Sequence, residues 1–175
     1  MLLENESLKL RALEPADLEL LYEWENNTEI WGISNTLAPF SKYVLHQYIE
    51  NSHRDLLESK QLRLIIELKL PSGNEAIGTV DLFEIDFYNK RAGIGILIAD
   101  TRHRKKGYAN LTVQLLEDYV VKQLDLNQLY CHIDMDNKAS LNLFKNAGYE
   151  LIGILKNWKK NFDGWKDVYF LQHIL

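Results

Sequence analysis

The segment from Arg102 to Val120, RHRKKGYANLTVQLLEDYV, constrains the fold and the function of this chain more than any other stretch. Its first five residues contain four cations, although the 175-residue chain as a whole carries a net charge of −5. The largely apolar run KRAGIGILIAD precedes it and predicts a central strand. Apolar residues at helical spacing follow the cations, so the segment predicts a cationic turn that leads from a strand into a helix.

The start of this predicted helix favours an anion-binding site. The first N–H groups of a helix lack intrahelical partners and lie at the positive end of the helix dipole. Gly107 permits close backbone approach and Ala109 is small, while Arg104, Lys105 and Lys106 add positive charge. The spacing alone leaves a solvated basic turn open, but cations at a helix N-terminus oppose the dipole unless an anion is present. The balance therefore favours an anion, such as a phosphate group, at this helix start.

Composition and the remaining motifs exclude several classes of function. The acidic net charge argues against a general nucleic-acid-binding protein. Gly93–Gly95 begins a G-x-G motif, but Ile98 stands where the dinucleotide fingerprint needs its third glycine. Cys131 is the only cysteine, which excludes an internal disulfide and a cysteine-based zinc site, and the histidines lack metal-ligand spacing. Because no signal-peptide pattern and no apolar run of about 20 residues is present, we expect no membrane partner and a cytoplasmic location.

The pattern of apolar and polar residues predicts an α+β fold in one domain, residues 1–175. Apolar runs predict strands at residues 7–13, 61–70, 75–86, 90–100, 128–135, 149–157 and 165–175. Apolar stripes at helical spacing predict helices at residues 14–27, 41–59, 107–124 and 137–148. Antiparallel strands thus come first and one strand–helix–strand crossover follows, which indicates a mixed sheet with helices on both faces.

Two signatures resemble those of the GNAT acyl-CoA N-acetyltransferases. RKKGYA resembles their Q/R-x-x-G-x-G/A motif, with Arg104, Gly107 and Ala109 in the diagnostic places. DNKASLNLFKNAGYELIG is similar to their second signature, N-x-x-(A/S)-x-x-x-(Y/F)-x-x-x-G-(F/Y). The opening LKLRALEPADLELLYEWENN resembles the start of the polyamine and ribosomal-protein branches, so the resemblance covers nearly the whole chain. It implies the GNAT fold, a mixed and mostly antiparallel sheet of about seven strands with a V-shaped splay between the fourth and fifth.

The resemblance also implies that acetyl-CoA lies in this splay as a co-substrate. Backbone groups of the fourth strand would bond its pantetheine arm, and the amides of the cationic turn would hold its pyrophosphate. The second signature would supply contacts to the pantetheine and to the adenosine side. The residues expected to bind acetyl-CoA are Ile96, Leu97, Ile98, Arg104, Lys105, Lys106, Gly107, Tyr108, Ala109, Asn137, Ser140, Phe144 and Lys145.

The usual general acid of the family is missing from this sequence. Many members carry a tyrosine in the second signature that protonates the departing thiolate, and here that position is Phe144. Ser140 lies one helical turn earlier and is the first substitute, ahead of Tyr149 and Tyr108. A merely structural Ser140 stays open, because a thiolate whose acid has a pKa near 8.5 is a tolerable leaving group without a proton donor.

A general base is needed because an alkyl ammonium has a pKa of about 10.4 and must lose a proton before it attacks. Asp81 and Glu84 are the expected bases, since we place both on one face of their strand near the acceptor cleft. The alternative is that both carboxylates are simply solvated. His132 fits a hydrogen-bonded core histidine better than a base. A strand N–H near Leu97 would stabilise the oxyanion.

The acceptor is the least constrained part of the prediction. A polyamine such as spermidine is the first expectation, because the chain resembles bacterial spermidine acetyltransferases in its first half. That branch carries an acidic pair before a proline, where this chain has Leu37 and Ala38 before Pro39. The alternatives are a peptide or ribosomal-protein N-terminal amine, an amino sugar, a catalytically weak acetyl-CoA sensor, or a structural protein that binds no CoA. We also expect a homo-oligomer, as in related proteins.

Overall fold

The computed structural model of the chain describes residues 2–34, 36–52, 55–161 and 163–175. Its strands are β1 (Leu8–Arg11), β2 (Leu62–Leu68), β3 (Glu75–Asp86), β4 (Arg91–Ile98), β5 (Gln128–Asp134), β6 (Glu150–Asn161) and β7 (Gly164–Ile174). Its helices are α1 (Leu18–Glu25), α2 (Thr28–Ser34), α3 (Lys42–Asn51), α4 (Leu56–Ser59), α5 (Tyr108–Leu124) and α6 (Lys138–Asn146), with 3-10 turns η1 (Pro15–Asp17) and η2 (Thr101–His103). No helix of the described residues is both long and apolar enough to span a membrane.

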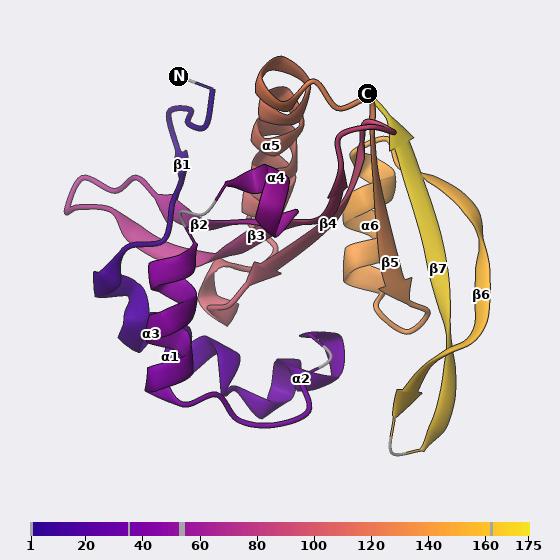
Figure 1. Ribbon diagram of the computed structural model, residues 1–175, viewed down its shortest axis with the longest axis horizontal. Helices are drawn as coiled ribbons and strands as arrows, with labels where there is room; N and C mark the ends of the chain where they lie inside the picture. Colours follow the sequence, from indigo (N-terminus) through magenta and orange to yellow (C-terminus); the bar gives the residue numbers. More distant parts are fainter. Residues whose placement is uncertain (1, 35, 53–54, 162) are drawn as a thin grey trace.

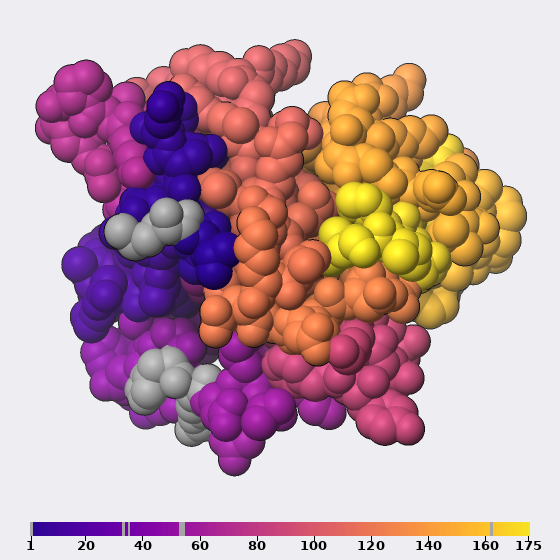
Figure 2. Space-filling model, turned by 90° about the horizontal axis from the view of Figure 1, so that it is seen from above, coloured from indigo at the N-terminus to yellow at the C-terminus, as the bar shows by residue number. Residues whose placement is uncertain are grey.

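The seven strands form one mixed sheet in the order β1-β2-β3-β4-β5-β7-β6 (Figure 1). Every neighbouring pair is antiparallel except β4 and β5, which are parallel and joined through α5. The predicted α+β class and the seven-stranded mixed sheet are confirmed. The surface of α5 runs between the N-terminal segment, in indigo, and the end of β7, in yellow (Figure 2).

Helices cover both faces of the sheet because the strands alternate their apolar side chains. On β2, Leu64 and Ile66 belong to the core cluster that includes α5 and α6. Ile65, between them, points to the other face and packs with Leu21 of α1 and Ile49 of α3. Because β2 is buried on both faces, its sequence is a nearly continuous apolar run.

The helical region before β2 differs from the prediction of one helix over residues 41–59. Asp55 starts a separate helix, α4, because its side chain accepts a hydrogen bond from the N–H of Leu57 at 2.9 Å. Residues 53–54 lie outside the described part of the chain. The short helix α2 was missed, since its seven residues include Gly32 and carry little periodicity.

The strands β4 and β5 separate soon after they begin. They pair only where Arg91–Gly93 meets Gln128–Tyr130, whereas β3 follows β4 as far as Ile98. The edge of β4 that faces β5 is therefore unpaired with β5 from Ile94 to Ile98, and Figure 1 shows the two arrows diverging. This wedge confirms the predicted splay. Helix α5 follows β4 after residues 99–107, which include η2, and α6 follows β5 after residues 135–137.

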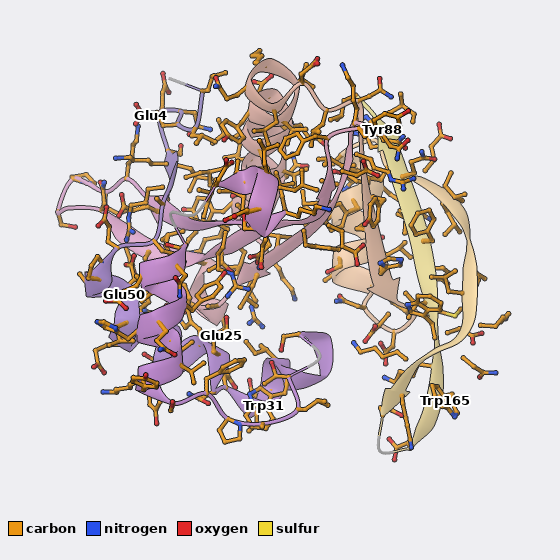
Figure 3. The ribbon with its side chains drawn as sticks, in the orientation of Figure 1. Glu4, Glu25, Trp31, Glu50, Tyr88 and Trp165 are labelled. Atoms are coloured by element: carbon orange, nitrogen blue, oxygen red, sulfur yellow. The ribbon has the colours of Figure 1, made fainter. Side chains whose placement is uncertain are left out.

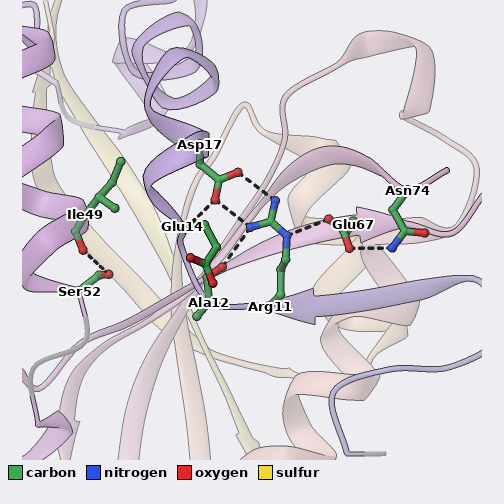
Figure 4. Close-up of polar contacts among 8 residues, drawn as sticks. All are labelled: Arg11, Ala12, Glu14, Asp17, Ile49, Ser52, Glu67 and Asn74. Carbon is green, nitrogen blue, oxygen red and sulfur yellow. Dashed lines mark hydrogen bonds and ion pairs between the residues drawn. The ribbon is translucent and has the colours of Figure 1, made fainter.

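An ion-pair cluster joins β1 to its neighbours on the face opposite α5 (Figure 4). Arg11 donates to both carboxylate oxygens of Asp17, at 2.7 and 2.9 Å, and to Glu67 at 2.8 Å. Burial alone would raise the pKa of Asp17, but Arg11 and the N–H of Glu14 outweigh burial and hold this pKa below its usual value. The cluster fixes the turn that leads from β1 into α1.

A second buried arginine ties the first helices to the sheet. Arg63 of β2 donates to Glu25 of α1 and to Asp81 of β3, each at 2.6 Å. Its guanidinium carbon also lies 5.4 Å from the ring centre of Tyr48 on α3. The three charged side chains are 17–21% exposed, so their interactions are only partly screened by water.

We expect the change Arg63→Met to destabilise the fold by about 3–5 kcal/mol, because it leaves two half-buried carboxylates without their cation. Urea unfolding followed by circular dichroism measures the change. The matched control is Arg102→Met, since Arg102 also contacts two carboxylates but is 76% exposed. An equal loss of the free energy of unfolding in the two variants would contradict the structural role of Arg63 and its two carboxylate partners.

Close packing of β3 against β4 requires glycine at position 78. A Cβ atom there would lie 1.9 Å from the carbonyl oxygen of Leu97, which is backbone and cannot move aside cheaply. We expect Gly78→Ala to lower the free energy of unfolding by about 1–3 kcal/mol. Gly153→Ala is the control, because no atom lies within 4 Å of that Cβ position. A stability loss at Gly78 no larger than at Gly153 would contradict this packing.

Candidate active site

A cavity of about 410 Å³ lies in the wedge between β4 and β5. It is bounded by the unpaired edge of β4, by β5, by the first turns of α6, and by α1 and α2 on the opposite side. Glu25 points from α1 toward the sheet, where it meets Arg63 (Figure 3). The cavity therefore joins elements that are far apart in the sequence.

The structure brings six of the fifteen predicted site residues to this cavity. Asp81, Ile96, Leu97, Asn137, Ser140 and Phe144 line it. Ile98 and the turn from Arg104 to Ala109 do not line it but follow Leu97 along the chain, and Lys145 is exposed on α6. Glu84 lies elsewhere, in a second cavity.

The turn before α5 has the backbone of an anion-binding site. Gly107 is the N-cap residue with φ of +85°, and Lys105 also has a positive φ, of 60°. No described side chain caps the first turn of α5, so its N–H groups are free to bind a ligand. Left-handed backbone conformations just before a helix can turn successive N–H groups toward one point, and such a cluster of donors binds anions.

The side chain of Arg104 bonds to the end of β4. Its guanidinium donates to the carbonyl oxygens of Ile98 and Ala99, at 2.9 and 3.2 Å. Ile98 is the last residue of β4 and Ala99 follows it, so Arg104 fixes the strand end, and its contact with a pyrophosphate stays a prediction. Lys105 and Lys106 are exposed and form no ion pair among the described residues.

The first turn of α6 holds Ser140 at the wall of the cavity. Asn137 caps the helix, and its Oδ1 accepts a hydrogen bond from the Ser140 N–H at 3.1 Å. Phe144 is 3% exposed and packs edge-on against Tyr149, with ring centres 4.9 Å apart. Tyr149 is buried behind Phe144 and does not line the cavity, so it is no proton donor there. Tyr108 packs near His103 and is also absent from the lining.

Asp81 and Glu84 share a sheet face for a different reason from the one predicted. Strict alternation would place residues three apart on opposite faces. A bulge between Phe83 and Asp86, with φ of +50° at Glu84, adds one residue and turns Glu84 toward Tyr130 of β5. Glu84 nevertheless lines the second cavity, so the structure does not bring it to Ser140.

The charged residues of the cavity are Asp134, which pairs with Lys159 at 3.0 Å, and the triplet of Asp81, Arg63 and Glu25. Burial raises the pKa of Asp81, and the positive charge of Arg63 opposes this rise. The sequence did not identify Glu25 or Arg63, because no local spacing connects them with Asp81. Only the pairing of β2 with β3 and the position of α1 bring the three together.

His132 is not the buried core histidine that the sequence favoured. Cys131 and Ile133 point into the core, so alternation along β5 turns His132 outward, where its ring is exposed. The ring stacks on Trp158 with centres 6.2 Å apart. Partial burial of the ring holds the pKa of His132 below its usual value, and the negative charge of Glu84 opposes part of this shift. The ring lines both cavities.

Comparisons with known proteins agree with this geometry. The family model described as "Acetyltransferase (GNAT) domain" matches residues 7–150. The spermidine N(1)-acetyltransferase of Vibrio cholerae is 28% identical over 145 residues, which is 83% of this chain and 80% of that protein. An uncharacterized N-acetyltransferase, p20, of Bacillus licheniformis is 30% identical over 168 residues, 95% of this chain and 92% of p20.

The crystal structure of spermidine N-acetyltransferase from Vibrio cholerae, in complex with CoA and spermine, has the same fold. It superposes with a TM-score of 0.85 at 26% identity and covers 97% of this chain and 96% of its own. The same protein has also been solved as a dodecamer. From the family match over most of its length and from this shared fold, the chain belongs to the GNAT acetyltransferases and is an acetyl-CoA-dependent N-acetyltransferase.

Proposed function

We propose that this enzyme acetylates a primary amine of a polyamine, with spermidine as the type of acceptor. The observation that carries the proposal is the charge of the wedge cavity. Two carboxylates, Glu25 and Asp81, share one arginine there, so the triplet retains one negative charge beside Ser140 and Leu97. A cationic acceptor is attracted to such a site. The spermidine acetyltransferases among its relatives support the same acceptor.

Acetyl-CoA, which supplies the activated acyl group, fits the features of the wedge. The uncapped start of α5 offers free N–H groups, and we propose that the amides from Arg104 to Ala109 hold the pyrophosphate. The edge of β4 at Ile96, Leu97 and Ile98 is open toward β5 and would bond the pantetheine as an added strand would. The side-chain amide of Asn137 retains N–H donors for the same arm. Lys145 would meet the adenosine side.

In the proposed mechanism, residues of the wedge position the amine and move two protons. Asp81 accepts a proton from the acceptor ammonium, directly or through water, and its raised pKa favours this role. The backbone N–H near Leu97 donates a hydrogen bond to the acetyl carbonyl oxygen. The neutral amine then attacks the thioester carbon, and the C–S bond breaks as the amide forms. The hydroxyl of Ser140 donates a proton to the departing sulfur and takes up the second proton that the nitrogen loses. Glu84 has no part in this chemistry, because it lies in the other cavity.

We also propose that residues 1–175 form one acetyltransferase domain and that the enzyme assembles from several copies. One sheet runs continuously from β1 to β6, and one core cluster includes residues of β1, α5 and β7. The dodecameric relative supports assembly. Size-exclusion chromatography with light scattering measures the number of copies.

The acceptor assignment is tested by an amine panel with thiol release as the readout. The panel contains spermidine, spermine, a monoamine, an amino sugar and a peptide with a free N-terminus. We expect the highest kcat/KM with a polyamine. A higher kcat/KM with the peptide or the sugar would overturn the polyamine assignment. No turnover with any amine, together with tight acetyl-CoA binding, would instead indicate a sensor.

The role of Ser140 is tested by Ser140→Ala and by a rescue at Phe144. We expect Ser140→Ala to lower kcat about 10²-fold, because the departing sulfur loses its proton donor. Phe144→Tyr in the same chain puts a hydroxyl on the residue that lines the cavity one turn later, and should recover part of the loss. Ser72→Ala, in an exposed turn, is the control. An unchanged kcat in Ser140→Ala would remove Ser140 from the mechanism.

A further inference from the structure

A second cavity, of about 900 Å³, lies where β4 and β5 are still paired. It is bounded by the end of β3 and the turn that follows, by β5 and β7, and by Leu57 and Lys60 near α4. The proposed chemistry uses none of these residues. The cavity is therefore a feature that acetyl transfer in the wedge leaves unexplained.

One wall of this cavity is aromatic. Tyr130, His132 and Phe170 contact one another, with ring centres between 5.2 and 5.8 Å apart. They lie on the outward face of β5 and β7, where alternation places every second side chain. The faces of tyrosine and phenylalanine rings attract cations, and an ammonium group is a common partner.

Glu84 supplies a negative charge beside this wall. Its Oε2 accepts a hydrogen bond from the Tyr130 hydroxyl at 2.5 Å, and no described cation forms an ion pair with it. Asp86, the other carboxylate of the cavity, is already paired with Arg91 at 3.3 Å. Lys60 is the remaining cation of the lining and lies on the α4 side.

The backbone conformation at Glu84 is strained, and it places the carboxylate beside the aromatic wall. A positive φ is unfavourable for a residue with a side chain, and here it occurs within the bulge of β3. Without the extra residue, the side chain of residue 84 would point to the other face of the sheet, where Leu82 lies in the core. Strain that persists in a folded chain is a sign of function.

The two cavities adjoin along β5. His132 lines both of them. Phe83, in the wall of the wedge cavity, contacts Tyr130 of the second cavity edge-on, with ring centres 6.2 Å apart. The two cavities therefore share His132 as a common wall, which is the arrangement that an elongated ligand bound in both would need.

We propose that the second cavity binds an ammonium group of the acceptor that is remote from the reacting amine. This inference rests on the proposed polyamine function and names the part of the site that recognises the second charge. Glu84 forms the ion pair with this ammonium, and the rings of Tyr130 and Phe170 lie against it. The enzyme then selects amines that carry a further cation at the end of an alkyl chain.

The experiment compares Glu84→Gln with the unchanged enzyme, using spermidine and n-butylamine as acceptors. Glutamine keeps the size of the side chain and an oxygen for the Tyr130 hydroxyl, but it removes the charge. We expect the ratio of kcat/KM for spermidine to that for n-butylamine to fall about tenfold, through the KM of spermidine. Glu58→Gln is the matched control, because Glu58 is exposed on α4 and does not line the cavity.

An unchanged ratio of the two kcat/KM values in Glu84→Gln would overturn the inference. This includes an equal fall of both activities, which would mean that Glu84 acts on the reacting amine. If the unchanged enzyme acetylates neither amine, the proposed function fails, and calorimetry with spermidine decides the inference separately. Binding of spermidine that weakens about tenfold in Glu84→Gln, but not in Glu58→Gln, supports the second site. Equal binding by all three proteins overturns it.

Discussion

The short pairing of β4 with β5 is the constraint on which the rest of the site depends. Three residue pairs hold the two strands together, and beyond them the backbone edge of β4 needs another partner. The fold keeps β4 straight in this region by pairing it with β3 up to Ile98 and by bonding its last carbonyls to Arg104. The start of α6 and the unpaired edge of β4 then line one cavity, and the turn before α5 follows the end of the same strand.

In the proposed function, partly buried charge selects the acceptor of this cleft. Arg63 neutralises the charge of one of its two partner carboxylates and also joins α1 to the sheet. The same contacts therefore hold α1 against the cavity and leave one net negative charge in it. The bulge of β3 divides the acidic residues of one strand between two cavities: Asp81 remains with the wedge, and Glu84 turns to the aromatic wall. A site that reacts with one amine thus has a neighbour suited to hold another cation.

The sequence predicted the parts of the site that depend on local backbone geometry. A glycine at the start of α5 and Asn137 at the start of α6 act within one turn of their own position, and the family signatures reinforce both. It did not predict contacts that depend on distant pairing. Glu25 and Arg63 meet only through the packing of α1 on β2. The bulge at Glu84 adds one residue to β3, so the side chains no longer alternate regularly between the two faces of the sheet. The outward position of His132 required knowing which face of β5 the helices cover.

Hydrogen–deuterium exchange with and without acetyl-CoA tests the central claim, that the wedge and the start of α5 form the cofactor site. We expect slower exchange at the amides of residues 94–98 and 104–109 when acetyl-CoA is added, because these N–H groups gain hydrogen-bond partners. We expect no change at residues 84–88, which border the second cavity. Unchanged exchange at both segments, under conditions where acetyl-CoA binds, would contradict this location of the cofactor site.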